Sequence, residues 1–478
     1  MKLSVFLYIS LSVIFPKLYA QSYNCFDIPN PSEPDKHVIK QCPFVKSTKP
    51  TFFRSKNLID GSSFNVNFKC DSTDSGLCQK AQSAFEMAGQ IISSVFMFEV
   101  PITLNATFSN LNDSNLLGSA TPSRFIPLIS EDGVPRLYPQ SLVKQFKFNV
   151  HPEYSSCDIY AQFNSAVNFW FKGDGPISPT QQNIHTVILH ELFHGLGFTS
   201  SWRNNLDSLL QYPSNGLSPV PYLITSASSK SIIFQGFIET IFDKFLVILP
   251  DNTTSSPLVP TSLTAYTSKL NEFGPPPTEF SSSLKFAESL MLSPQWNSVA
   301  PFILNKSSIA NTLVFLPRGY QLVNGTYVET SVNPFLSGSS ISHVSFASYT
   351  NSQDFLMRYK LEPGFTIEDL LSRGGNYQND DGTGVIGPRL RSIMESIGYK
   401  TLYNPNPIIP KVPSSENVTI FSNPKSNITF QGPFPPIIAN SFSSKQVSDS
   451  NKILNNCFTI WNCIIMILGL LFVRWEIS

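Results

Sequence analysis

The stretch NIHTVILHELFHGLGF, Asn183–Phe198, decides the fold prediction for this chain. His190 and His194 are four residues apart, so on a helix of 3.6 residues per turn they lie about 40° apart on one face. Two imidazoles on adjacent turns can hold one zinc ion. Glu191 lies between them and is free to take a proton from water without being a ligand itself. The segment 183–196 is therefore predicted to be a helix that carries metal chemistry.

A solvent-exposed helix face with two histidines is the alternative interpretation. The flanks of the motif are apolar rather than polar, which fits an exposed face poorly. Imidazoles buried without partners would destabilise the fold, and a bound metal removes that cost. The sequence therefore favours zinc, Zn²⁺, as the cofactor.

The motif resembles that of the metzincin metalloproteases, in which the sequence after the second histidine continues with Gly-x-x-His. Gly197 matches the glycine, but Ser200 stands where the third histidine is expected. Leishmanolysin-like metzincins take their third histidine from far downstream, after a long insertion. In this chain His343 is the candidate, and Met357 in DFLM looks like the methionine turn below the zinc. The resemblance covers roughly residues 63–399.

This resemblance implies a function and a set of site residues. The zinc ligands would be His190, His194 and His343, and Glu191 would be the general base. The implied activity is a zinc-dependent endopeptidase that hydrolyses protein or peptide substrates. The alternative from another class is a catalytically inactive adhesion or recognition glycoprotein at the cell surface, on the same scaffold. The intact Glu191 counts against that alternative.

A second pattern offers a rival third ligand. FIETIFDKF has the Glu-x-x-x-Asp spacing of thermolysin-like zincins, with Glu239 as the ligand and Asp243 as its orienting partner. An amphipathic helix with two exposed acids is the simpler interpretation of the same residues. GLGF and the setting of Met357 favour His343. Tyr359 resembles the Met-x-Tyr of astacin-like enzymes, but aromatic packing is the expected role.

Composition limits the class of protein. The 478 residues allow two or three domains, and 14% charged residues, against about 25% usually, argue against disorder. Lys+Arg and Asp+Glu both number 33, so the net charge is zero and no nucleic-acid partner is expected. Helices and strands mix along the chain. The predicted fold class is α+β, a metzincin-like zinc protease body with a twisted sheet and an active-site helix.

The two ends predict a location. Residues 1–20 read as a signal peptide, and the apolar run 457–473 followed by Arg474 reads as a transmembrane helix, with a lipid-anchor signal as the alternative. The expected localisation is the secretory pathway to the cell surface, as a single-pass type I membrane protein or a GPI-anchored one. The membrane would then be a partner through the C-terminal anchor. Oligomeric state stays open.

Composition shifts suggest the domain boundaries. After the signal peptide we expect an N-terminal extension or pro-segment (21–60), two catalytic subdomains (61–200 and 201–401) and a stalk rich in Pro, Ser and Asn (402–456). Seven Asn-x-Ser/Thr sequons suit a glycoprotein.

Five cysteines precede the anchor, and Cys25–Cys42 and Cys70–Cys78 are the simplest local disulfide pairs. A latency device in which Cys42 caps the zinc is the alternative use of that residue.

Overall fold

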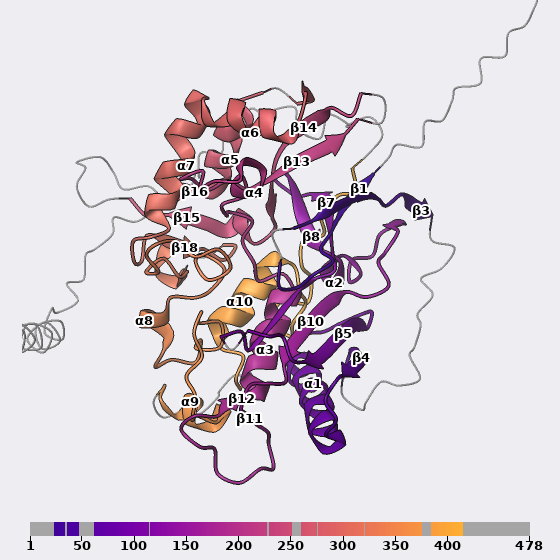
Figure 1. Ribbon diagram of the computed structural model, residues 1–478, viewed down its shortest axis with the longest axis vertical. Coiled ribbons are helices and arrows are strands. Elements are labelled where there is room, and N and C mark those ends of the chain that lie inside the picture. Colours follow the sequence, from indigo (N-terminus) through magenta and orange to yellow (C-terminus); the bar gives the residue numbers. More distant parts are fainter. Residues whose placement is uncertain are drawn as a thin grey trace, which may run out of the picture. The chain divides into compact units, whose positions relative to one another are not determined.

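Two β-sheets joined by a single residue form the framework of the chain (Figure 1). The computed structural model describes residues 23–33, 36–46, 62–113, 115–226, 229–250, 260–274, 276–319, 321–374 and 384–413. All of these belong to one unit, which ends by Pro424. Ser123 separates the last strand of the first sheet from a strand of the second, so the chain passes directly between them.

The first sheet has four strands, β4 (Phe64–Cys70), β5 (Ile102–Ser109), β10 (Ile159–Asn164) and β6 (Gly118–Pro122), in that order. Buried and half-buried residues alternate along the whole of β5, as a strand with one face on the core requires. The first three strands are parallel, and β6 runs antiparallel to β10. Within the described residues β6 is an edge strand.

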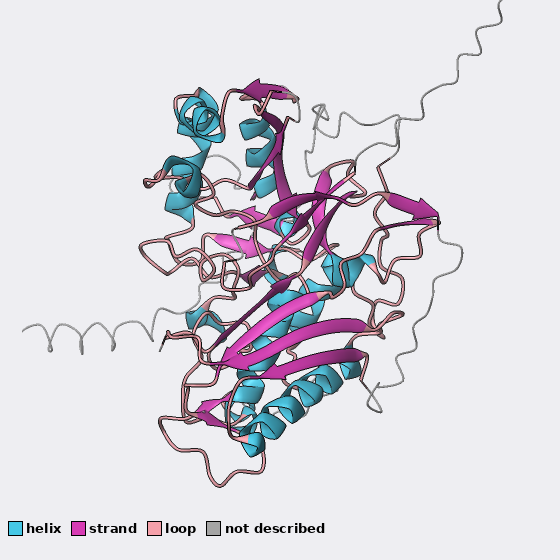
Figure 2. Cartoon of the chain, turned by 45° about the vertical axis from the view of Figure 1, so that its right-hand side comes forward, coloured by secondary structure: helices cyan, strands magenta, loops and turns pink. Residues whose placement is uncertain are grey.

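Two helices pack side by side on this sheet, α1 (Ser75–Val95) and α3 (Ile184–Gly195). Figure 2 shows the strands lying across these helices. The helix α3 contacts both β6 and β10, and these contacts fix where the helix lies relative to the edge strand. A Cβ on Gly195 would lie 2.5 Å from Ile159 of β10, and the lack of one lets the helix end approach the sheet closely.

The second sheet has seven strands in the order β13-β14-β8-β7-β1-β2, with β17 paired to β14. Its first two strands in sequence come from the predicted N-terminal extension. The strand β1 (Asn24–Asp27) pairs with β7, and the Cys25–Cys42 disulfide joins β1 to the end of β2 (Val38–Gln41). Residues 24–41 are therefore built into a sheet of the body.

The remaining elements follow in chain order. The other strands are β3 (Phe44–Lys46), β7 (Arg124–Ile129), β8 (Pro135–Pro139), β9 (Val150–Pro152), β11 (Phe169–Trp170), β12 (Gln182–Asn183), β13 (Val220–Thr225), β14 (Ile232–Thr240), β15 (Leu246–Ile248), β16 (Thr261–Ser262), β17 (Thr278–Phe280), β18 (Leu313–Phe315) and β19 (Thr326–Tyr327). The other helices are α2 (Gln140–Val143), α4 (Asp207–Leu210), η1 (Asp243–Phe245), α5 (Leu263–Asn271), α6 (Ser283–Met291), α7 (Pro294–Lys306), η2 (Leu322–Asn324), α8 (Phe346–Tyr349), α9 (Ile367–Ser372) and α10 (Pro388–Ile397).

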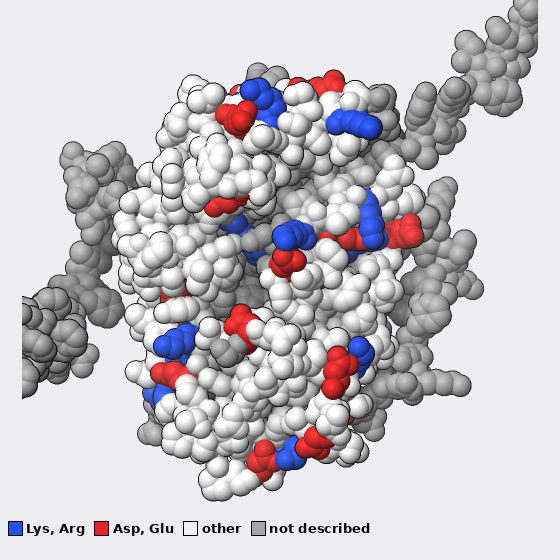
Figure 3. Space-filling model, viewed as in Figure 1, with Lys and Arg blue, Asp and Glu red and all other residues white. Residues whose placement is uncertain are grey.

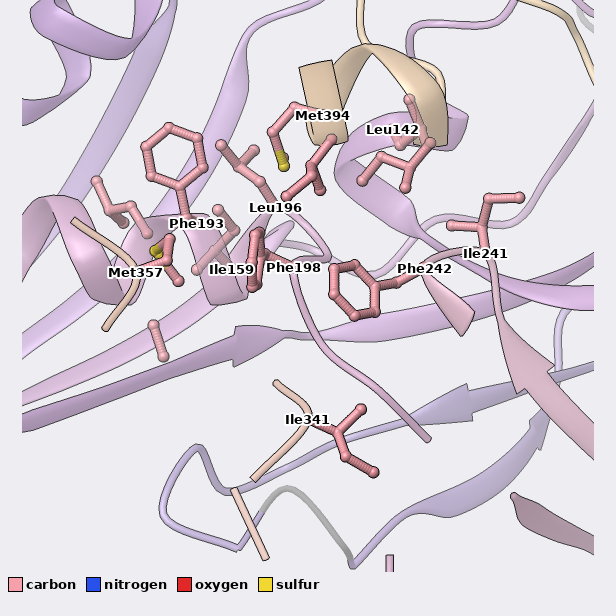
Figure 4. Close-up of a cluster of buried hydrophobic side chains, with 14 of the residues drawn as sticks. Leu142, Ile159, Phe193, Leu196, Phe198, Ile241, Phe242, Ile341, Met357 and Met394 are labelled. Atoms are coloured by element: carbon pink, nitrogen blue, oxygen red, sulfur yellow. The ribbon is translucent and has the colours of Figure 1, made fainter. Parts of the chain in front are cut away.

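The core beneath the helix α3 is rich in aromatic and long aliphatic side chains. Figure 4 shows part of this cluster, in which Phe193 and Phe198 come from α3 and the turn after it and Phe242 comes from a segment far away in sequence. The rings of Phe198 and Phe242 lie 4.9 Å apart between centroids. Apolar burial of this kind, at about 25 cal/mol per Å², holds the end of α3 against the chain around residue 242.

The predicted fold class and localisation need correction. The architecture is α+β, but no helix in the described part of the chain is long and apolar enough to cross a membrane. The prediction of a body with a membrane anchor, and with it of a single-pass type I membrane protein, is therefore wrong on this finding. The predicted signal peptide (1–20), the anchor (457–473) and the stalk beyond residue 413 lie outside the described residues.

Candidate metal centre

The helix α3 presents the two histidines of its motif toward one place. Its N-cap is Asn183, whose side chain accepts hydrogen bonds from the backbone amides of His185 and Thr186 at 3.0 and 3.4 Å. Three turns later the helix ends, and Gly197 continues the chain at a positive φ of 104°. His190 is almost fully buried, and His194 is half-buried.

The structure brings His343 to these two histidines across 149 residues of sequence. The Nε2 atom of His343 lies 3.0 Å from that of His190 and 3.2 Å from that of His194. The Nε2 atoms of His190 and His194 lie 3.2 Å apart. In the part of the chain that the structure describes, this is the one cluster of three His, Cys, Asp or Glu ligand atoms close enough to share an ion.

Backbone carbonyls determine which nitrogen of each ring carries the proton. The Nδ1 atom of His190 donates to the carbonyl of Leu356 at 2.7 Å, because a carbonyl oxygen can only accept. His194 donates in the same way to Phe198 at 2.8 Å and His343 to Ser339 at 2.9 Å. Each neutral ring then has its lone pair on Nε2, so three lone pairs face one another.

Burial keeps the three rings neutral. It lowers the pKa of His190 to about 4 and that of His194 to about 3, and it lowers the pKa of His343 well below its usual value. The positive charges of Arg358 and Arg203 lower the pKa of His190 and of His194 further. Neutral imidazoles are the form that binds metal ions.

The donor set fits zinc. Three unprotonated Nε2 atoms cannot hydrogen-bond to one another, so they repel unless a cation lies between them. Tetrahedral ligands at 2.0–2.1 Å from a zinc ion are about 3.3 Å apart, close to the separations seen here. Backbone acceptors on the far nitrogens are also the usual arrangement around metal-binding histidines. His190, His194 and His343 as zinc ligands stay a prediction, which this geometry supports.

Glu191 lies beside the three histidines and is held by the edge strand. Its Oε2 atom accepts a hydrogen bond from the backbone amide of Ala120 in β6 at 3.0 Å. Burial raises the pKa of Glu191 to about 8, and the bond from Ala120 partly offsets this rise. The carboxyl group is thus oriented by the cleft wall and is a stronger base than an exposed glutamate.

The site opens into a cleft of about 660 Å³. One wall is the strand β6, and the opposite side is lined by Ser337–Ser339 and Tyr359–Leu361. Pro31 and Ser32, from the N-terminal residues, also line it. Figure 3 shows widely spaced charged side chains on one face of the chain, which is hollowed near its middle.

Met357 is the residue that the resemblance assigned to a methionine turn below the zinc, and this assignment stays a prediction. It is fully buried in the same cluster as Phe193 and Ile159 (Figure 4). The residue before it supplies the carbonyl that orients His190. Tyr359 is 37% exposed, lines the cleft and lies 5.6 Å from the ring of Phe346.

The rival pattern FIETIFDKF lies elsewhere and does not form an amphipathic helix. Glu239 is the last residue but one of the strand β14, Asp243 begins the 3-10 helix η1, and both are fully buried. The carboxylate of Glu239 accepts hydrogen bonds from Thr264 and Thr267 and pairs with Arg136 at 3.5 Å. Neither acid lines the cleft.

The cysteines form both predicted disulfides, Cys25–Cys42 and Cys70–Cys78. Because Cys42 is bonded and buried, a role in capping the zinc is excluded in this state. Cys157 is a buried free thiol.

Sequence reasoning missed the backbone groups that build the site. The amide of Ala120 and the carbonyls of Phe198, Leu356 and Ser339 carry no signal in residue type. Only tertiary structure shows which peptide groups face the histidines and Glu191.

Comparison with known proteins defines the family. A family model described as SPBPB7E8-like matches residues 25–430, so the chain belongs to the SPBPB7E8-like family. An uncharacterized protein of Schizosaccharomyces pombe, PB7E8.01, is 28% identical over 364 residues, which cover 70% of this chain. The chain spans 62% of that relative's length. Neither description names an activity.

No solved structure matches this chain. The metzincin-like part of the predicted fold class therefore finds no counterpart among solved folds, and the fold class is corrected to α+β alone. The chemistry of the site has to be argued from its own residues.

Proposed function

We propose that this chain is a zinc-dependent endopeptidase. The observation that carries the proposal is the convergence of three unprotonated Nε2 atoms beside the carboxyl group of Glu191, in an open cleft. His190, His194 and His343 would hold the ion. The chemistry that zinc supplies when bound is Lewis acidity, which polarises a substrate carbonyl and acidifies water.

Glu191 would move the proton. Its carboxylate would accept a proton from the attacking water and deliver it to the leaving amine, a contribution of roughly 10²–10⁴-fold for a positioned acid–base group. The amide of Ala120 keeps the carboxyl group aligned with the cleft.

The edge strand β6 offers a surface for a peptide backbone. The amide of Ala120 points away from β10 and into the cleft, since it donates to Glu191. A strand edge that faces a cleft can pair with an extended peptide through main-chain hydrogen bonds. This arrangement supports peptide substrates over small molecules.

Hydrolysis of a mixed peptide library by the full chain tests the proposal. The zinc-loaded wild type should cleave peptides, lose this activity with 1,10-phenanthroline and regain it with added zinc. Glu191→Gln should keep one zinc per chain and lose at least about 100-fold in activity. Glu239→Gln, a buried carboxylate away from the cleft, is the matched control and should stay active. Wild-type protein that binds no zinc, or Glu191→Gln protein with full activity, would overturn the proposal.

A further inference from the structure

The carboxylate of Asp243 is the centre of a buried polar network behind the metal site. It is fully buried and accepts five hydrogen bonds. The hydroxyls of Ser200 and Ser201 donate at 2.6 and 2.5 Å, and the amide of Ser201 at 2.9 Å. Thr240 donates from its amide at 3.0 Å and its hydroxyl at 2.8 Å. Only an acceptor-rich group can receive all of these donors.

Two of these partners, Ser200 and Ser201, belong to the loop that follows the helix α3, and the third, Thr240, ends the strand β14. The same loop contains Phe198, whose carbonyl accepts the Nδ1 proton of His194. The carbonyl of Thr199 lies 2.9 Å from the same hydroxyl of Thr240, whose one proton it shares with Asp243, so Asp243 and Thr240 together hold the backbone of residues 199–201. The position of this loop therefore determines how the ring of His194 is oriented.

The loop also reaches the third histidine. The backbone amide of Ser200 donates to the hydroxyl of Ser342 at 3.1 Å. Ser342 directly precedes His343, whose own Nδ1 is held by Ser339. This one loop therefore contacts the ring of His194 through Phe198 and the residue before His343 through Ser200. The two histidines are 149 residues apart in sequence.

Glu239 provides an internal comparison. It precedes Asp243 by four residues, is equally buried and also accepts from threonine hydroxyls. Its partners are Arg136, Thr264 and Thr267, and among the described residues no hydrogen bond joins these three to the loop or to the histidines. The two acids of one sequence pattern therefore hold different parts of the fold.

We propose that Asp243 is a positioning residue for the metal site: it fixes the loop 198–201 so that His194 and His343 keep their Nε2 atoms at binding distance. This inference rests on the proposed metal site. It makes Asp243 a support of His194 and His343, in place of the role as orienting partner of Glu239 that the sequence pattern suggested.

The zinc affinity of full-length variants tests this role separately from stability. Affinity is measured by competition with a chromophoric chelator, and the melting temperature is measured in the presence of EDTA. Asp243→Asn, which replaces one of the two accepting oxygens with an NH₂ group and removes the charge that the five donors face, should weaken zinc binding by about 10–100-fold. Glu239→Gln should lower the melting temperature and leave the zinc affinity within about twofold of wild type.

Smaller changes keep the test decisive if Asp243→Asn fails to fold. Ser200→Ala and Ser342→Ala should each weaken zinc binding by several-fold, and the double variant should lose less than the product of the two, because both act through one loop. Wild-type affinity in Asp243→Asn, or in both serine variants, overturns this inference alone. A weakening in Glu239→Gln equal to that in Asp243→Asn also overturns it. Wild-type protein that binds no zinc overturns the proposed function and this inference together.

Discussion

Replacing His343 with alanine should remove most of the stability that zinc gives to the folded chain. Structural zinc sites contribute about 10–16 kcal/mol through four ligands, or roughly 3 kcal/mol per ligand. Loss of one ligand then weakens binding about 100-fold. At a zinc concentration 100 times the wild-type Kd, binding stabilises the wild type by about 2.7 kcal/mol and the variant by about 0.4 kcal/mol. His343 is almost fully buried, with its Nε2 atom 3.0 Å from that of His190, so water cannot easily replace its ring.

Differential scanning fluorimetry with and without zinc measures this effect. At on the order of 2 °C per kcal/mol, zinc should raise the melting temperature by about 5 °C in the wild type and about 1 °C in His343→Ala. Glu239→Gln should keep the full zinc-induced shift, whatever its own melting temperature, because Glu239 lies with Arg136 away from the cleft. A full 5 °C shift in His343→Ala would refute His343 as a ligand, and loss of the shift in Glu239→Gln would favour the thermolysin-like assignment.

Three further predictions concern the fold around the site. Burial lowers the pKa of His185 to about 4, so between pH 6.5 and 4 only the unfolded chain takes up a proton at this residue. The free energy of unfolding therefore decreases as the pH is lowered through this range. His185→Gln should make this decrease smaller by about 2–3 kcal/mol, as measured by urea unfolding at pH 7 and pH 4.5, and an equal decrease in wild type and variant would contradict the prediction. Replacing Cys25 and Cys42 together with alanine should cost about 3 kcal/mol in urea unfolding, since the disulfide spans 17 residues, and a loss below about 1 kcal/mol would count against this. Gly197→Ala should cost about 1–3 kcal/mol, because φ is 104° and the added Cβ would lie 2.7 Å from Pro139. Unchanged thermal unfolding of that variant would show that the turn relaxes.

Local patterns predicted the elements that carry the site. The helix predicted over 183–196 is α3. The spacing of its histidines and its apolar residues lie within one short stretch of sequence, so neighbouring residues contain the information.

The pattern FIETIFDKF shows where local reasoning fails. Its spacing suits a helix, yet residues up to Thr240 form the strand β14, which lies between β13 and β8 in the second sheet. Pairing on both sides satisfies the backbone and buries both faces of the strand, so the sheet overrides a weak helical preference. The sequence alone could not show this, because the neighbours of β14 come from distant parts of the chain.

The long separation in sequence between His194 and His343 determines how the three histidines can come together. His190 and His194 are placed by a single helix, whereas His343 follows His194 by 149 residues and is brought to it only by the folded chain. A contact next to it is also distant in sequence, because Ser342 accepts a hydrogen bond from the amide of Ser200. The proposed zinc binding should therefore depend on the tertiary structure of the second half of the body, because a chain with only α3 formed offers two of the three proposed ligands. Any substitution that loosens the contact between the loop 198–201 and the residues before His343 should thus appear first as weaker zinc affinity, before the chain loses its secondary structure.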